Sequence, residues 1–301
     1  MHVVGLFLLV GITLGMLGGG GSILTLPLLV YVAGLEAKEA VAMSLLIVGV
    51  TSVFGVMPHL RRGHVDYRAA LVFGPLSMAG AYAGGRLASY FSDTMLLVLF
   101  SLMMVLTAAA MLRRRAPAVA RPQPGKRRTG WLALEGALVG TFTGLVGAGG
   151  GFLLVPALVF MAKLEMRRAV GTSLFIIVLN SLSGLGGHLS HVSLHWSLAF
   201  TLAGAAALGA VIGASLAGRV PARALRRGFG VFVLGMGFLV LALQAPPQVR
   251  AWAMLHVGWA LAGLAALALS GVGWLTVRYL QKSTRRVPPP PVESLSVAPP
   301  R

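Results

Sequence analysis

Two glycine clusters stand at matched places in the chain and are the residues best suited to bind a ligand. The first occupies residues 18–21 and is followed by Ser22, and the second occupies residues 147–151. Glycine destabilises a helix by about 1 kcal/mol per residue relative to alanine, so neither cluster can hold a stable helix. Such a break frees backbone N–H groups at the start of the next helix, and these donors, together with the helix dipole, form an anion site.

Prolines and polar side chains near the two clusters extend the candidate site. One proline follows each cluster and can bend the next helix or interrupt its hydrogen bonds. Serine and asparagine side chains recur in the following apolar segment, where each could donate to an anion or bond back to its own helix. The predicted substrate-binding residues are therefore Gly18, Gly20, Gly21, Ser22, Pro27, Ser44, Gly147, Gly149, Gly150, Gly151, Pro156, Ser173 and Asn180.

Two histidines at matched helix ends are candidates for a different role. The unperturbed pKa of histidine lies near neutrality, so His59 and His188 could carry a proton coupled to transport. The competing interpretation places each of them at the membrane interface without a chemical role. No Ser/His/Asp set, carboxylate pair or metal-ligand spacing is present, so the sequence predicts neither an enzyme nor a metal or other cofactor.

The composition indicates that these residues lie in a membrane protein. Of 301 residues, 57% are hydrophobic and 11% are charged, and mean hydropathy is +0.86. A water-facing surface needs more charge than this, so a soluble globular enzyme is excluded. The net charge of +18 and the pI near 11.8 are typical of nucleic-acid binding, but a nucleic-acid partner is excluded for a chain this apolar.

The apolar segments divide the chain into a predicted polytopic, all-α bundle in the lipid bilayer. Nine segments are expected at residues 3–33, 40–58, 69–91, 94–112, 131–162, 169–187, 196–217, 224–243 and 251–277. The predicted organisation is a first membrane repeat at 1–112, a basic cytoplasmic linker at 113–130, a second membrane repeat at 131–243, an extra transmembrane helix at 244–280 and a disordered Pro-rich tail at 281–301.

An internal repeat relates the two membrane regions. Alignment of the second half on the first, without a gap, places Gly18 on Gly147, Pro27 on Pro156 and Ser44 on Ser173. About half of the positions from 15 to 45 are identical to their counterparts in this register, which also places His59 on His188. Because each first segment contains a glycine break, we expect it to be a helical hairpin that gives each half an odd number of elements.

Charge placement predicts that the second repeat is inverted relative to the first. Short loops rich in Lys and Arg stay on the cytoplasmic side. With the linker inside and an odd number of crossings per half, 22 of the 25 basic residues fall inside, whereas an even number of crossings gives no bias. The residues left outside are Lys38, Arg86 and Arg250. The sequence therefore predicts a multi-pass protein of the cell inner membrane.

The paired motifs resemble those of the sulfite exporter TauE/SafE family, also called the 4-toluene sulfonate uptake permease family. The resemblance rests on the two glycine-rich elements, each ending at a proline, and on the Glu-Ala-Val-Ser-Leu-like stretches at residues 36–45 and 165–174, and it covers about residues 5–243. It implies a transporter of small sulfur-containing anions. Ser22 departs from the pattern, since the second half has Gly151 there, and this leaves the choice of substrate open.

The chain is therefore expected to move a small anion, such as sulfite, a sulfonate or a related organosulfur anion, by alternating access at the glycine breaks. Three alternatives stay open: a transporter of a non-sulfur solute, a membrane-embedded enzyme, and a scaffold without transport. Glycines spaced four apart, such as Gly80 and Gly84, are expected to serve helix packing instead.

Overall fold

Helices account for all the regular secondary structure in the part of the chain that the computed structural model describes. This part comprises residues 2–17, 22–113, 126–147, 149–160, 162, 164–216 and 222–244, all within one unit, Met1–Val257. The all-α prediction is confirmed for these ranges. Residues 18–21 of the first glycine cluster, the expected span at 251–277 and the tail at 281–301 lie outside them.

Each half of the described chain contributes five α-helices in the same order. The first half contains α1 His2–Leu17, α2 Ser22–Tyr31, α3 Ala37–Arg61, α4 Tyr67–Leu87, a 3-10 turn at Ala88–Tyr90 and α5 Asp93–Arg113. The second half contains α6 Lys126–Val146, α7 Gly151–Phe160, α8 Met166–His188, α9 Trp196–Leu216 and α10 Ala222–Leu243. The first segment of the second half is thus split into α6 and α7 at its glycine cluster, as the sequence predicts, and in the first half α1 and α2 lie on either side of residues 18–21.

Helix α6 begins before the apolar segment expected at residues 131–162. Helix α6 begins at Lys126, inside the stretch at 113–130 predicted to be a linker, and α5 runs to Arg113. Lysine and arginine have high helix propensity, so basic residues next to an apolar helix can extend it into water.

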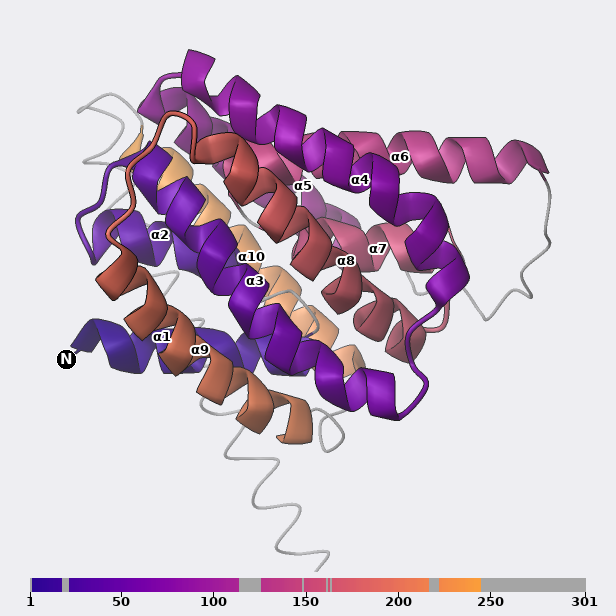
Figure 1. Ribbon diagram of the computed structural model, residues 1–301. Coiled ribbons are helices and arrows are strands. Elements are labelled where there is room, and N and C mark those ends of the chain that lie inside the picture. Colours follow the sequence, from indigo (N-terminus) through magenta and orange to yellow (C-terminus); the bar gives the residue numbers. More distant parts are fainter. Residues whose placement is uncertain are drawn as a thin grey trace, which may run out of the picture. The chain divides into compact units, whose positions relative to one another are not determined.

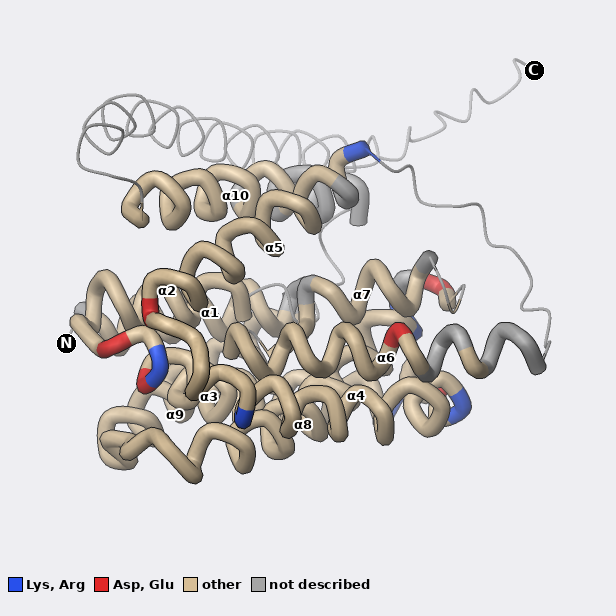
Figure 2. The backbone as a smooth tube through the Cα atoms, turned by 90° about the horizontal axis from the view of Figure 1, so that it is seen from above, with Lys and Arg blue, Asp and Glu red and all other residues tan. Residues whose placement is uncertain are grey.

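The helices have the composition of membrane spans. Among the described residues, three helices are long and apolar enough to cross a bilayer: Ala37–Arg61, Arg167–His188 and Trp196–Ser215. Each of the three reaches the length of about 20 residues that a helix needs to cross the hydrocarbon core. In Figure 2 the charged residues gather toward the helix ends. Among the described residues, Glu135 in the middle of α6 is the acid farthest inside a helix.

Helices from one half pack mainly on helices from the other half. Helix α1 lies against α9, and their counterparts α6 and α4 lie against each other in the same way (Figure 1). Helices α3 and α8 cross each other at the centre, and each also contacts the other half's outer helix, α9 or α4. Helix α5 pairs with α10, as Figure 2 shows from above. Every one of these contacts therefore joins the two repeats.

Glycines allow the closest of these helix contacts. A Cβ added at Gly11 or Gly15 of α1 would collide with a backbone carbonyl of α9, and one at Gly209 or Gly213 of α9 would collide with a carbonyl of α1. The repeat counterparts behave identically between α4 and α6. There the glycines are Gly80, Gly84, Gly140 and Gly144. The expected packing role of Gly80 and Gly84 is confirmed, because only glycine lets two backbones approach this closely.

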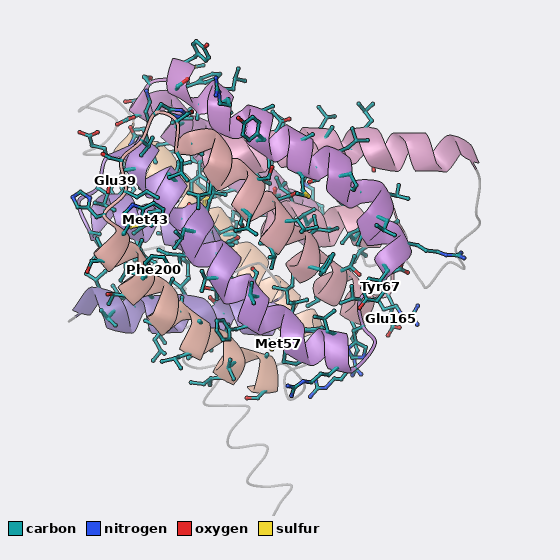
Figure 3. The ribbon with its side chains drawn as sticks, in the orientation of Figure 1. Glu39, Met43, Met57, Tyr67, Glu165 and Phe200 are labelled. Atoms are coloured by element: carbon teal, nitrogen blue, oxygen red, sulfur yellow. The ribbon has the colours of Figure 1, made fainter. Side chains whose placement is uncertain are left out.

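The two central helices begin at opposite ends of their shared crossing. Figure 3 labels Glu39, in the first turn of α3, and Glu165, directly before α8, and the two lie at opposite ends of the helix pair. A contact between the N-terminal part of one helix and the C-terminal part of the other agrees with this, since Leu45 lies near Gly184 and Leu174 lies near Gly55. Helices α3 and α8 are therefore antiparallel.

Candidate functional site

The second glycine cluster is an unwound turn between α6 and α7. Gly147, Gly149 and Gly150 have φ of 74°, 60° and 78°, in the left-handed region that favours glycine. The N–H of Gly147 donates to Thr143 O at 2.9 Å, which closes the last turn of α6, and α7 begins at Gly151. The expected break is confirmed. The N–H groups of Leu153 and Leu154 donate to Gly150 O at 3.0 and 2.8 Å, so the first two N–H groups of α7 are the ones without an intrahelical acceptor.

The turn is packed against the crossing of α3 and α8. A Cβ at Gly147 would lie 2.7 Å from Val41 Cα on α3, and one at Gly149 would collide with Val48 and lie 3.4 Å from Ile177 on α8. All three break glycines are buried. Unwound backbone at this depth is tolerated only where protein buries it or where it lines a watery cavity, and here the central helices bury it.

Ser44 ties the break to the first half of the chain. Its hydroxyl donates to the carbonyl oxygen of Gly147 and also lies 2.8 Å from Val41 O in its own helix. The side chain is fully buried on α3. The single hydroxyl proton of Ser44 is shared between two carbonyl oxygens. Ser44 therefore holds the glycine turn in place, and its hydroxyl already has acceptors within the protein.

The other predicted serine and the asparagine also have protein partners. Ser173 donates to Val170 O at 2.8 Å in its own helix, the alternative noted from the sequence. Asn180 Nδ2 donates to Ser77 Oγ of α4 at 2.7 Å, and its Oδ1 has no partner among the described residues. Ser77 was not identified from the sequence, because its repeat counterpart is Ala206 and the match between the halves gave no signal there.

The two predicted prolines and Ser22 lie in the short helices that follow the glycine clusters. Pro27 is inside α2 and Pro156 is inside α7, and both helices continue through the proline without ending. Each proline removes one N–H from a short helix, and so frees one carbonyl in its first turn. Ser22 begins α2 and is fully buried. Gly18, Gly20 and Gly21 are outside the described residues.

The matched histidines end the two central helices, as predicted, but in different surroundings. His188 is fully buried, and its Nε2 lies 2.8 Å from Gly144 O in the last turn of α6. His59 is half-buried and lies beside His64, with ring centroids 5.8 Å apart. Because a carbonyl oxygen only accepts, Nε2 of His188 carries the proton. His188 therefore stabilises the helix end that leads into the glycine turn.

The arrangement supplies hydrogen bonds and no charge. Helix α3 has no Asp, Glu, Lys or Arg between Glu39 and Arg61, and α8 has none after Arg168. No group of three or more His, Cys, Asp or Glu residues that could hold a metal ion occurs in the described ranges. Hydroxyls, backbone N–H groups and a helix N-terminus can bind a small polar or anionic solute by hydrogen bonding.

The apolar helices and this buried helix break are typical of multi-pass membrane proteins of the transporter class. Comparison with known families matches residues 3–240 to the description "Sulfite exporter TauE/SafE". The chain belongs to the TauE/SafE family, and the predicted resemblance is confirmed.

Curated relatives are named as transporters. A "Probable membrane transporter protein" of Xylella fastidiosa strain Temecula1 is 34% identical over 252 residues, which cover 82% of this chain and 94% of the relative. "Probable membrane transporter protein YunE" of Bacillus subtilis strain 168 is 29% identical over 219 residues, covering 64% of this chain and 79% of the relative. No solved structure matches the chain significantly.

Proposed function

We propose that the protein carries a small anion, such as sulfite, a sulfonate or a related organosulfur anion, across the inner membrane, with the substrate bound at the paired glycine breaks. The observation that carries this proposal is the unwound turn at Gly147, Gly149 and Gly150, buried against α3 and α8. The family's description supports the class of substrate.

Alternating access through two inverted repeats is the proposed mechanism. Its support is that equivalent helices make equivalent contacts between the halves. Helix α1 packs on α9, and their repeat counterparts α6 and α4 pack on each other. The opposite starting points of α3 and α8 give further support, as does the bias of basic residues. In this topology the linker at 113–130 is cytoplasmic and residues 1–112 and 131–243 are the two repeats. Rocking of one repeat against the other would move the breaks from one side to the other.

Solute flux into proteoliposomes tests the proposal directly. Purified protein should move sulfite, or another member of a panel of small organic anions, down a gradient. A comparison with and without a pH gradient shows whether protons are coupled, the role proposed for His59 and His188. Absence of flux for every anion under every gradient would contradict the proposal and favour a non-sulfur solute, a scaffold or an enzyme.

A pair of glycine variants connects flux to the break. Gly149→Ala places a Cβ against Val48 at a residue with φ of 60°. Gly34→Ala introduces the same kind of backbone strain, with φ of 73°, but in a loop where the Cβ meets nothing within 4 Å. We expect Gly149→Ala to lower flux strongly and Gly34→Ala to leave it near the wild-type rate. Equal losses would mean that backbone strain, and not the site, explains the effect.

A further inference from the structure

Two buried serine hydroxyls at the crossing of α3 and α8 have no hydrogen-bond partner in the part of the chain that the structure describes. Ser52 of α3 is 0% exposed and Ser181 of α8 is 1% exposed, and neither Oγ makes a hydrogen bond with any of the described residues. They are counterparts in the internal repeat. A buried hydroxyl without a partner costs folding free energy, so each such group requires an explanation.

Both serines lie close to the glycine turn. Gly149 is placed between Val48 and Ile177, and Ser52 and Ser181 are each one helical turn further along α3 and α8. A Cβ at Gly49 would lie 3.0 Å from Ser181 Cβ, so Ser181 faces the other helix at the crossing. The hydroxyls therefore flank the place where the two central helices and the break meet.

The other two hydroxyl side chains of α3, Ser44 and Thr51, are already bonded, which separates them from Ser52. Thr51 donates to Ile47 O at 2.5 Å, and Ser44 donates to the carbonyl oxygen of Gly147. Buried serines usually bond back to their own helix, as Ser101 of α5 does with Val98 O at 2.8 Å. Ser52 and Ser181 do not, although both sit inside helices where such a carbonyl is available.

We propose that Ser52 and Ser181 donate hydrogen bonds to the oxygens of the transported anion, and that their uncharged site takes a monovalent oxyanion in preference to a divalent one. The inference rests on the proposed transport function. Two hydroxyl donors and the first N–H groups of α7 can each meet one oxygen. No Lys or Arg lies between Glu39 and Arg61 of α3 or after Arg168 of α8 to compensate a second charge.

The charge preference follows from the cost of removing ions from water. The desolvation penalty in a continuum grows with the square of the charge, so a dianion requires about four times the compensation of a monoanion of equal size. Neutral dipoles supply part of that compensation, and a buried cation would be needed for the rest. Methanesulfonate carries one charge and sulfate carries two on a similar tetrahedral centre, which makes them a suitable pair of probes.

The test measures binding and flux of methanesulfonate and sulfate at pH 7.5 with full-length protein. In detergent, methanesulfonate should raise the thermal unfolding midpoint of the wild type more than sulfate does. In proteoliposomes, methanesulfonate uptake should exceed sulfate uptake. Ser52→Ala and Ser181→Ala should each raise the KM for methanesulfonate by about tenfold, the effect of one lost hydrogen bond of ordinary strength. The double variant should lose more than either single variant.

Stability without substrate separates a binding role from a structural one. Because the two hydroxyls have no partner among the described residues, Ser52→Ala and Ser181→Ala should leave the substrate-free unfolding midpoint unchanged or raise it. Ser101→Ala is the matched control, since this serine is buried and bonded within its helix. The KM of the Ser101→Ala variant for methanesulfonate should stay at the wild-type value.

Three results would overturn the inference. In the first, the wild type transports methanesulfonate but the serine variants keep the wild-type KM, which leaves the proposed function standing. In the second, sulfate is transported as well as methanesulfonate, which refutes the charge preference alone. In the third, the wild type transports no anion at all, and the proposed function fails together with this inference.

Discussion

The Nε2 atom of His188, the last residue of α8, lies 2.8 Å from the carbonyl oxygen of Gly144 in the last turn of α6. The last carbonyls of a helix have no intrahelical donor, and buried carbonyls need one. His188 supplies it, one turn before the left-handed Gly147. Ser44 of α3 donates to the carbonyl oxygen of Gly147 itself. Helices α3 and α8, which come from different halves, therefore together hold the end of α6.

Replacement of His188 should therefore reduce stability before it affects any proton transfer. His188→Leu leaves the Gly144 carbonyl buried and unsatisfied, which costs about 1–3 kcal/mol. His188→Gln, whose amide retains a donor, should lose less. Thermal unfolding in detergent measures both variants.

The repeat counterpart provides the control for that prediction. His59 is half-buried, and its Nδ1 has no partner among the described residues. His59→Leu should lower the unfolding midpoint less than His188→Leu does. If the two variants lost equal stability, the bond to Gly144 would not be the reason for the loss at His188.

Glycine spacing along α9 gives a second prediction about stability. A Cβ at Gly209 would collide with the carbonyl oxygen of Leu8 on α1, so Gly209→Ala must separate the two helices and should destabilise the fold by about 1–3 kcal/mol. Gly204, earlier in the same helix, has nothing within 4 Å of its Cβ position. Gly204→Ala should be neutral or stabilise by up to about 1 kcal/mol, because alanine is the better helix former.

Unfolding midpoints of the two α9 variants, measured in one detergent, decide this prediction. Both substitutions add the same methyl group to the same helix, so propensity and hydrophobicity are matched. Equal midpoints for Gly204→Ala and Gly209→Ala would show that α1 and α9 are not in close backbone contact.

Much of this fold could be predicted from the sequence because the physical signal was local. Clustered glycines cannot continue a helix, so the split between α6 and α7 follows directly. The spacing of Gly80 and Gly84 indicated close helix contacts, and the structure places both against α6.

The partners of the polar side chains could not be predicted, because they depend on which helices meet. Nothing near Ser44 in the sequence indicates Gly147, far away in the other half of the chain, as its acceptor. The bond from Asn180 to Ser77 joins α8 to α4 and has no counterpart at Ala206. Repeat matching finds residues that both halves share, and it therefore misses contacts that only one half makes.

The pH dependence of stability should depend in part on His191, in the turn after α8. Burial lowers the pKa of His191 below its ordinary value of 6.5, and the charges of Lys38 and Arg86 lower it further. The unfolded chain then binds a proton on this residue at a higher pH than the folded protein does. As the pH falls below about 7, folding stability should decrease until the folded-state pKa is passed.

Substitution of His191 isolates this contribution from the other histidines. His191→Gln should show a smaller drop in unfolding midpoint between pH 7.5 and pH 5 than the wild type. Lys38→Gln removes one of the charges that lower the pKa and should reduce the drop in the same direction. A drop in His191→Gln as large as that of the wild type would contradict the assignment.

The inverted topology predicts that two equivalent residues of the internal repeat lie on opposite sides of the membrane. Arg62 follows α3 and His191 follows α8, both are exposed, and the register of the internal repeat superimposes them. In a parallel repeat they would lie on the same side of the membrane. In the proposed topology Arg62 is cytoplasmic and His191 is on the opposite side.

The chain contains no cysteine, so Arg62→Cys and His191→Cys can each be made in the native background. In intact cells, a membrane-impermeant maleimide should label His191→Cys and not Arg62→Cys, and disruption of the membrane should make Arg62→Cys reactive. Labelling of both variants from the same side would refute the inversion, whatever the substrate proves to be.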